Sequence, residues 1–204
     1  MRALEKAGFR VVRQRKHVVM TNGERVVTVP RHNPVNAFTM GAALRGETMS
    51  EHKAAIAWTR SGPNFLKGQF SRAHTWTFDG GTVVPASPST SIIPAPWANP
   101  VGVDPEEAFV ASIASCHMLT FLWVAGRQGF VVESYEDDAV GLLTKNEQKI
   151  PWVSAVTLSP RIVYGGDKQP THDDEAKLHH AAHEQCFIAN SVKTSVRVTG
   201  FDPS

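Results

Sequence analysis

The residues of this chain whose type and surroundings indicate chemistry are its two cysteines. Cys116 lies inside a long apolar stretch, and Cys186 ends a histidine-rich segment, with 69 residues between the two. Two cysteines in a reducing compartment are more often reactive than a structural disulfide. A thiolate can be oxidised and then joined to a second thiol. The competing interpretation is that both are merely buried, since free cysteine is among the most buried residue types.

A metal site is a second possibility for the later cysteine. The pattern HHxxHxxC places His179, His183 and Cys186 on one face of a helix, at positions i, i+4 and i+7. Imidazole nitrogen and thiolate sulfur are ligands that zinc and iron accept. A chain with such a site would belong to another class of protein.

The element that must position Cys116 is a helix predicted over residues 104–129. Asp104 can cap its first turn, Pro105 suits the first helical position, and Glu107 completes a capping box. Nearly all that follows is apolar up to Gly126 and Gly129, which provide a stop signal. A helix apolar on nearly every face is expected to be buried on nearly every face.

This helix reaches the length of a membrane span. Its acidic start and the polar residues Ser112, Ser115 and His117 favour the central helix of a soluble domain instead. We interpret His117 as a core histidine, because it points about 100° away from its neighbour Cys116. With no secretory segment and no membrane span, the expected compartment is the cytoplasm.

The remaining elements of residues 49–204 predict an α+β domain. A meander of three strands is expected over residues 53–62, 65–81 and 82–87, followed by a proline-rich ordered loop over 85–105. Further strands are expected over 130–143, 152–166 and 191–200, with a turn at 146–151. A second helix over 171–186 is capped by Thr171 and carries acidic residues in its first turn.

The segments DPEEAFVASIASCHMLTFL and HEQCFIANSVKTSVRV resemble the OsmC/Ohr family of thiol peroxidases over about residues 50–200. The resemblance implies an OsmC-like fold, with antiparallel sheets wrapped around two central helices in an intertwined homodimer. It implies reduction of organic hydroperoxides, with Cys116 as the peroxidatic and Cys186 as the resolving cysteine. A dithiol of the lipoamide type would be the reductant. The family needs no cofactor, and its motif explains Cys186 without a metal.

The resemblance also implies a carboxylate and an arginine beside the reactive thiol. Glu106 matches the carboxylate, although it could also be only a first-turn charge that the helix dipole favours. Ten residues place it about 15 Å from Cys116 along one helix, so a shared site requires two antiparallel copies of the helix and thus a dimer. Arg72 on the second strand is the best candidate for the arginine, with Arg60 behind it. An isolated strand arginine is otherwise more often exposed to solvent.

Four apolar residues are expected to form the walls of the substrate pocket and to suit greasy peroxides over hydrogen peroxide. They are Trp97, Phe109, Ile113 and Phe187.

The first 48 residues differ in charge from the rest. They hold nine Lys/Arg and three Asp/Glu, a net charge of +6, whereas residues 49–204 hold twelve and sixteen, a net charge of −4. This asymmetry suggests two origins and a domain boundary at 48/49. A basic segment can bind nucleic acid or an acidic surface.

The order helix, three strands, helix in this segment, with EKAGFRVVRQRKHVVM and RVVTVPRHNPVNAFTMG, resembles the HicA toxins over about residues 1–46. Those toxins have a double-stranded-RNA-binding-like fold and cleave messenger RNA. The resemblance implies that His17 is catalytic, and Arg13, Arg15 and Lys16 could hold phosphate beside it. The closing helix is cut short, so a truncated segment without activity is the favoured interpretation, and nucleic acid is not an expected partner. An RNA-cleaving fusion and a non-catalytic or metal-binding OsmC-like protein are the alternatives to the peroxidase.

Overall fold

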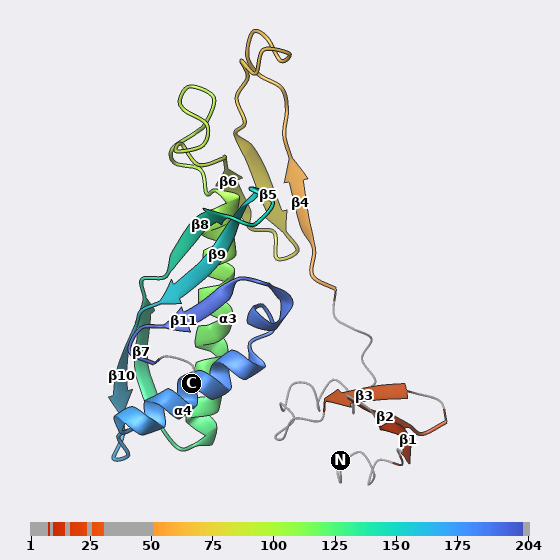
Figure 1. Ribbon diagram of the computed structural model, residues 1–204, viewed down its shortest axis with the longest axis vertical. Helices are drawn as coiled ribbons and strands as arrows, with labels where there is room; N and C mark the ends of the chain where they lie inside the picture. Colours follow the sequence, from red (N-terminus) through yellow and green to blue (C-terminus); the bar gives the residue numbers. More distant parts are fainter. Residues whose placement is uncertain (1–7, 9, 15–16, 24–25, 31–50, 202–204) are drawn as a thin grey trace. The chain divides into compact units, whose positions relative to one another are not determined.

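The computed structural model describes residues 8, 10–14, 17–23, 26–30 and 51–201. The chain divides into two units, residues 1–53 and 54–204 (Figure 1). The division falls five residues after the boundary that charge alone suggests.

The first unit contains an antiparallel sheet of three strands in the order β1-β2-β3. The strands span Arg10–Gln14 (β1), His17–Thr21 (β2) and Val26–Pro30 (β3), which confirms all three predicted strands. At the turn between β2 and β3, Gly23 has a φ of 98° and its N–H donates to Thr21 Oγ1 at 3.1 Å. The two predicted helices of this segment lie outside the described residues.

The second unit opens with the predicted meander β4-β5-β6, over Ala54–Ala57 (β4), His74–Phe78 (β5) and Val83–Ala86 (β6). Strand β5 is shorter than the prediction and starts only at His74. The reason is that the preceding backbone is bonded elsewhere: the N–H of Ser71 donates to Ser61 O and that of Arg72 to Trp97 O, both at 2.9 Å. Arg72 therefore lies in a loop and not on a strand.

Helix α3 spans Pro105–Arg127 and begins as predicted. The Asp104 carboxylate accepts the N–H of Glu107 at 2.7 Å, and the Glu107 carboxylate accepts the N–H of Asp104 at 3.0 Å. Gly129, with a φ of 81°, follows the end of the helix. The local signals in the sequence therefore indicated both ends of the helix.

Two predicted strands each divide into two. The first becomes β7 (Val131–Asp137) and β8 (Val140–Lys145), and the second becomes β9 (Pro151–Leu158) and β10 (Pro160–Gly165). Strand β7 pairs with β10, and β8 pairs with β9. The four strands therefore form one long hairpin that bends in the middle, and its two halves belong to different sheets. At the bend, the Asp137 carboxylate accepts the N–H of Ser159 at 2.7 Å.

Helix α4 spans His172–Gln185 and is followed by the short helix η1, Ala189–Ser191. Thr171 and Asp174 form its capping box, which confirms the predicted start. Strand β11, Ser195–Val198, then pairs with β9 in the parallel direction and gives the sheet order β11-β9-β8.

The core of the second unit follows one stripe of α3. Ile113 packs in a cluster with residues of β9 and β11, whereas Phe121, Val124 and Ala125 pack in a second cluster with Leu178 of α4. Figure 1 shows α4 crossing the C-terminal half of α3. The architecture is therefore α+β, with two helices packed against antiparallel sheets, as predicted.

The prediction that α3 is buried on nearly every face is wrong for the single chain. Its buried residues form one stripe (Ile113, His117, Phe121, Val124 and Ala125), whereas Leu119 is 60% exposed. By length and composition α3 could cross a membrane, and only 28% of its most apolar window is buried. Its packing against β7, β8, β9 and α4 makes it the core helix of this domain.

Candidate functional site

The two thiols meet where α4 ends against the middle of α3. Cys116 is half-buried on α3, and Cys186, the C-cap of α4, is fully buried. The side chain of Cys116 is a hydrogen-bond partner of the Cys186 thiol, and both cysteines are free. The fold therefore brings together two reactive groups that lie 69 residues apart in the sequence.

The surroundings of Cys186 keep it protonated. Burial, and then the hydrogen bond with Cys116, raise its pKa to about 12. The N–H of Ala189, which donates to Cys186 Sγ at 3.4 Å, acts in the opposite direction but does not compensate. At neutral pH Cys186 is a thiol.

A buried pair of histidines joins the same two helices. Nε2 of His117 and Nδ1 of His179 are hydrogen-bonded at 3.1 Å, and the residues are 1% and 3% exposed. Burial, reinforced by His179 and His183, lowers the pKa of His117 to about 3, and burial lowers that of His179 to about 4. Both rings are therefore neutral near pH 7.

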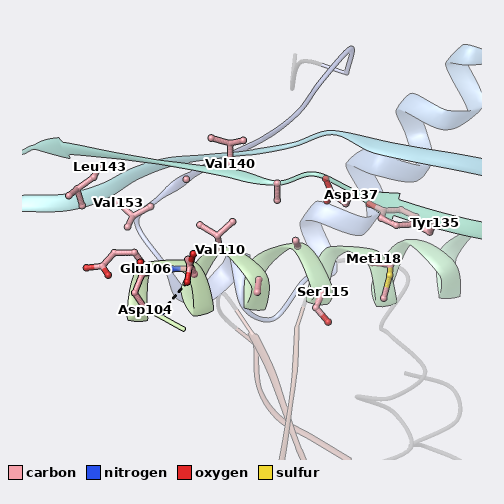
Figure 2. Close-up of a pocket in the computed structure, with 15 residues that line it drawn as sticks. Asp104, Glu106, Val110, Ser115, Met118, Tyr135, Asp137, Val140, Leu143 and Val153 are labelled. Carbon is pink, nitrogen blue, oxygen red and sulfur yellow. Dashed lines mark hydrogen bonds between the residues drawn. The ribbon is translucent and has the colours of Figure 1, made fainter. Parts of the chain in front are cut away.

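Glu106 lies at one end of a cavity of about 660 Å³ beside α3. Ser115 and Met118 of α3, on either side of Cys116 in the sequence, also line this cavity, and Figure 2 shows Tyr135 and Asp137 at its other end. The remaining wall is mostly apolar and comes from α3, β8 and β9.

The far end of this cavity carries two polar atoms without a partner among the described residues. They are the Tyr135 hydroxyl and Asp137 Oδ2, both buried. Burial raises the pKa of both side chains. Unpaired buried polar atoms are rare in folded proteins, so this end of the cavity is suited to a polar partner.

Arg72 lies in the loop just before β5, at the sheet β4-β5-β6. Its Nη1 donates to the carbonyl oxygens of Gly68 at 3.4 Å and Phe70 at 3.1 Å, and its guanidinium stacks 4.2 Å from the centre of the Phe70 ring. Together with aromatic side chains and Pro105 it lines a second cavity of about 530 Å³. Because Pro105 is eleven residues before Cys116, the two lie about 16 Å apart along α3.

The four predicted wall residues lie in different places in the protomer. Ile113 is fully buried in the core, and Phe109 packs against the same cluster. Trp97 is half-buried in the proline-rich loop, where its carbonyl accepts the N–H of Arg72. Phe187 follows Cys186 and is 62% exposed. Their role as substrate walls stays a prediction.

The two alternative sites can be placed only in part. His17 lies on β2, but its side chain is outside what the structure describes, so its predicted role in RNA cleavage stays a prediction. In the described part of the chain, no three His, Cys, Asp or Glu residues gather closely enough to hold a metal ion. His179 is instead bonded to His117.

The histidine pair is the part of the site that the sequence did not predict. The sequence placed His117 in the core and His179 in a possible metal motif, and the two are separated by 62 positions. No local pattern indicates such a contact, because it depends on how α3 and α4 cross.

The comparisons with known proteins agree with the fold and identify the family. Residues 98–200 match the OsmC-like protein family. An OsmC-like protein of unknown function from Vibrio cholerae is 50% identical, with a TM-score of 0.71, over 74% of this chain and 98% of that one. The chain therefore belongs to the OsmC-like family. No curated protein matches it.

More distant structures share the fold. An organic hydroperoxide resistance protein OsmC from Legionella pneumophila is 15% identical, with a TM-score of 0.53, over 74% of this chain and 98% of that one. An organic hydroperoxide resistance protein from Elizabethkingia anophelis is 17% identical, with a TM-score of 0.54, over 74% of this chain and 97% of that one.

Proposed function

We propose that this OsmC-like protein is a thiol-dependent peroxidase that reduces organic hydroperoxides in the cytoplasm. The observation that carries the proposal is the contact between the thiols of Cys116 and Cys186. Two proteins of this fold are named for organic hydroperoxide resistance, but the much more similar Vibrio protein has no known function. The proposal therefore depends on the chemistry of the thiols more than on these likenesses.

In the first step, Cys116 as thiolate attacks the distal oxygen of the hydroperoxide. The O–O bond breaks, the alkoxide leaves and takes up a proton to become an alcohol, and Cys116 becomes a sulfenic acid. Cys116 suits this role better than Cys186, because it is only half-buried whereas Cys186 is closed off from solvent.

In the second step, the sulfur of Cys186 attacks the sulfenic sulfur of Cys116. The S–O bond breaks, the Cys186 proton and the hydroxyl leave as water, and a disulfide forms. An external dithiol then reduces this disulfide and is itself oxidised. The hydrogen bond between the two thiols in the reduced protein supports this step.

A complete site requires a second copy of the chain. Glu106 lies about 15 Å along α3 from Cys116 of the same protomer, beyond the reach of a side chain. Arg72 lines a cavity together with Pro105, at this same N-terminal end of α3. An antiparallel pairing of two α3 helices brings the N-terminal end of one helix toward the middle of the other. Arg72 and Glu106 of one protomer then serve Cys116 of the other.

The uncovered side of α3 supports this pairing. Apolar side chains on α3 and on the neighbouring strand β8 are open to solvent in the single chain: Leu119, Val140, Leu142 and Leu143 are 47–65% exposed. Large apolar side chains that are exposed in the single chain are typical of a protein interface. The homodimer that the proposal needs would cover it.

The test is peroxide consumption by the intact protein with a dithiol reductant. We expect wild type to consume cumene hydroperoxide and to form a Cys116–Cys186 disulfide detectable by mass spectrometry. The Cys116→Ser variant should neither consume the peroxide nor form the disulfide, whereas Cys186→Ser should still form the sulfenic acid on Cys116. Continued consumption by Cys116→Ser would rule out the proposal.

A further inference from the structure

We infer that the hydrogen bond between His117 and His179 sets the position of Cys186 against Cys116, which makes both histidines positioning residues for disulfide formation. The biological use of this pair depends on the proposed peroxidase function. The effect of the histidine pair on the two thiols does not depend on that function, because the tendency of the thiols to form a disulfide can be measured without a peroxide.

The four residues belong to one helix crossing. Cys116 and His117 are consecutive on α3 and point about 100° apart, so they contact α4 from different sides of α3. His179 and Cys186 are seven residues apart on α4, on one face and about 10 Å from each other. The contacts His117–His179 and Cys116–Cys186 therefore fix α4 on α3 at two separate points.

Two fixed points restrict what the helices can do. If α4 slides along its own axis, or if α3 rotates, the two histidines separate and the two cysteines separate at the same time. Holding one pair therefore holds the other. The thiol contact itself is weak, since thiols are poor hydrogen-bond donors and acceptors. The histidine contact is the one able to maintain the geometry.

An apolar pair at the same place would not define one arrangement. The neighbouring contacts between α3 and α4 are apolar, through Phe121, Val124, Leu178 and Ala182, and apolar side chains tolerate several packings of similar energy. Two buried rings allow one hydrogen-bonded arrangement. Losing it would leave two more ring nitrogens unpaired, beside His117 Nδ1, which already lacks a partner within the described residues.

The ring of His179 is itself held firmly. It packs between Phe121 of α3 and Phe201, which follows β11, with ring centres 4.5 and 4.9 Å away. Phe201 in turn stacks on His172 at the start of α4, at 4.9 Å. The ring of His179 is thus held between α3 and the segment after β11, which suits a residue that sets the position of another.

The experiment compares two amides at position 117. The amide of the glutamine variant His117→Gln reaches the place of Nε2 and can keep the bond to His179. The shorter amide of His117→Asn reaches only the place of Nδ1 and cannot bond to His179. Leu158→Val, a change in the fully buried core around β9, controls for a general loss of packing.

The measurement is the equilibrium between the dithiol and the disulfide of the intact protein in buffers of reduced and oxidised dithiothreitol. Two electrons and two protons pass from the protein thiols to oxidised dithiothreitol. We expect His117→Asn to lower the equilibrium constant for the disulfide at least about tenfold, since about 1 Å of misplacement can cost that much. His117→Gln and Leu158→Val should stay within about threefold of wild type.

An unchanged constant in folded His117→Asn would overturn the inference. If that variant does not fold, the same comparison moves to His179, where the amide of His179→Asn takes the place of Nδ1 and His179→Ala has none. Equal equilibrium constants for disulfide formation in those two variants would also overturn the inference.

Reaction with cumene hydroperoxide separates this inference from the proposed function. A wild type that forms the disulfide in dithiothreitol buffers but is not oxidised by peroxide contradicts the peroxidase and leaves the positioning role standing. A His117→Asn protein that forms the sulfenic acid as fast as wild type but closes the disulfide more slowly supports both.

Discussion

At the scale of single residues, Cys186 lies where it meets Cys116 but where water does not reach it. Burial favours the neutral thiol, and the thiolate is the form that attacks sulfenic sulfur. The same burial that brings the sulfurs together therefore slows the step that joins them. The pH dependence of that step follows directly.

Disulfide formation from the Cys116 sulfenic acid should become about tenfold faster for each pH unit between about pH 6 and pH 9, because the attacking thiolate is a minor species. Burial, the largest cause that raises the pKa of Cys186, still acts once Cys116 is a sulfenic acid, so no plateau is expected within this range. Quenched-flow mass spectrometry after one equivalent of peroxide gives the rate, with Cys186→Ser as the control that forms no disulfide. A rate that does not change with pH would contradict this prediction.

The buried histidines should make the protein less stable in mild acid. Their folded pKa values, about 3 for His117 and about 4 for His179, lie below the ordinary value of 6.5. The unfolded chain therefore binds more protons as the pH falls below 6.5, and the stabilisation present above that pH is lost down to about pH 4. Between pH 7 and pH 5 the loss is about 2 kcal/mol for each histidine.

Urea unfolding at pH 7 and pH 5 measures this loss. His117→Gln has one buried histidine fewer, so it should lose about 2 kcal/mol less than wild type over the same interval. Other titrating groups are common to both proteins and cancel in the difference. Equal losses in the two proteins would mean that His117 is accessible to protons in the folded state.

At the scale of elements, the starts of α3 and α4 could be predicted because their signals are local. Asp104, Glu107, Thr171 and Asp174 bond within one turn, and the structure contains both capping boxes. The three strands of the first unit and the turn at Gly23 were predictable for the same reason.

The cap of α3 should contribute measurably to stability. Asp104→Ala removes the acceptor for the Glu107 N–H and should lower the free energy of unfolding by about 1 kcal/mol. Asp104→Asn keeps an acceptor oxygen and should stay within about 0.5 kcal/mol of wild type. Denaturant melts of the two variants test this, and equal stabilities would show that the Glu107 N–H finds another partner.

Elements whose form depends on distant contacts were not predictable. The bend after Asp137 depends on the N–H of Ser159, 22 residues later, and nothing in the alternation of 130–143 marks it. The loop around Arg72 depends on Trp97 O, because that bond replaces a strand partner. The same limit applies to the site: Cys116 and Cys186 could be named from the sequence, but the His117–His179 bond could not.

At the scale of the whole molecule, the exposed side of α3 connects the fold to the proposed dimer. The sequence predicted burial on nearly every face, and the single chain buries one stripe. The prediction and the structure agree if a second chain buries the exposed side of α3. The same pairing would bring Arg72 of one protomer toward Cys116 of the other.

Mixed dimers test whether Arg72 acts across the interface. Co-expressed Cys116→Ser and Arg72→Ala chains should recover about a quarter of wild-type peroxidase activity, because half of the dimers are mixed and each of those has one complete site of two. Each variant alone should be nearly inactive. An inactive mixture would mean that Arg72 serves its own protomer, and an active Arg72→Ala variant would mean that it serves no site.

The parallel pairing of β11 with β9 has a consequence for how the protein is made. Strand β9 is the middle strand of its sheet, and one of its edges pairs with β11, residues 195–198. During synthesis on the ribosome that edge stays open, and Cys116 has no partner sulfur, until nearly all of this domain has emerged. A nascent chain would therefore meet oxidants with a thiol that cannot yet be protected, so synthesis under oxidative stress is the moment when irreversible oxidation of Cys116 is most to be expected.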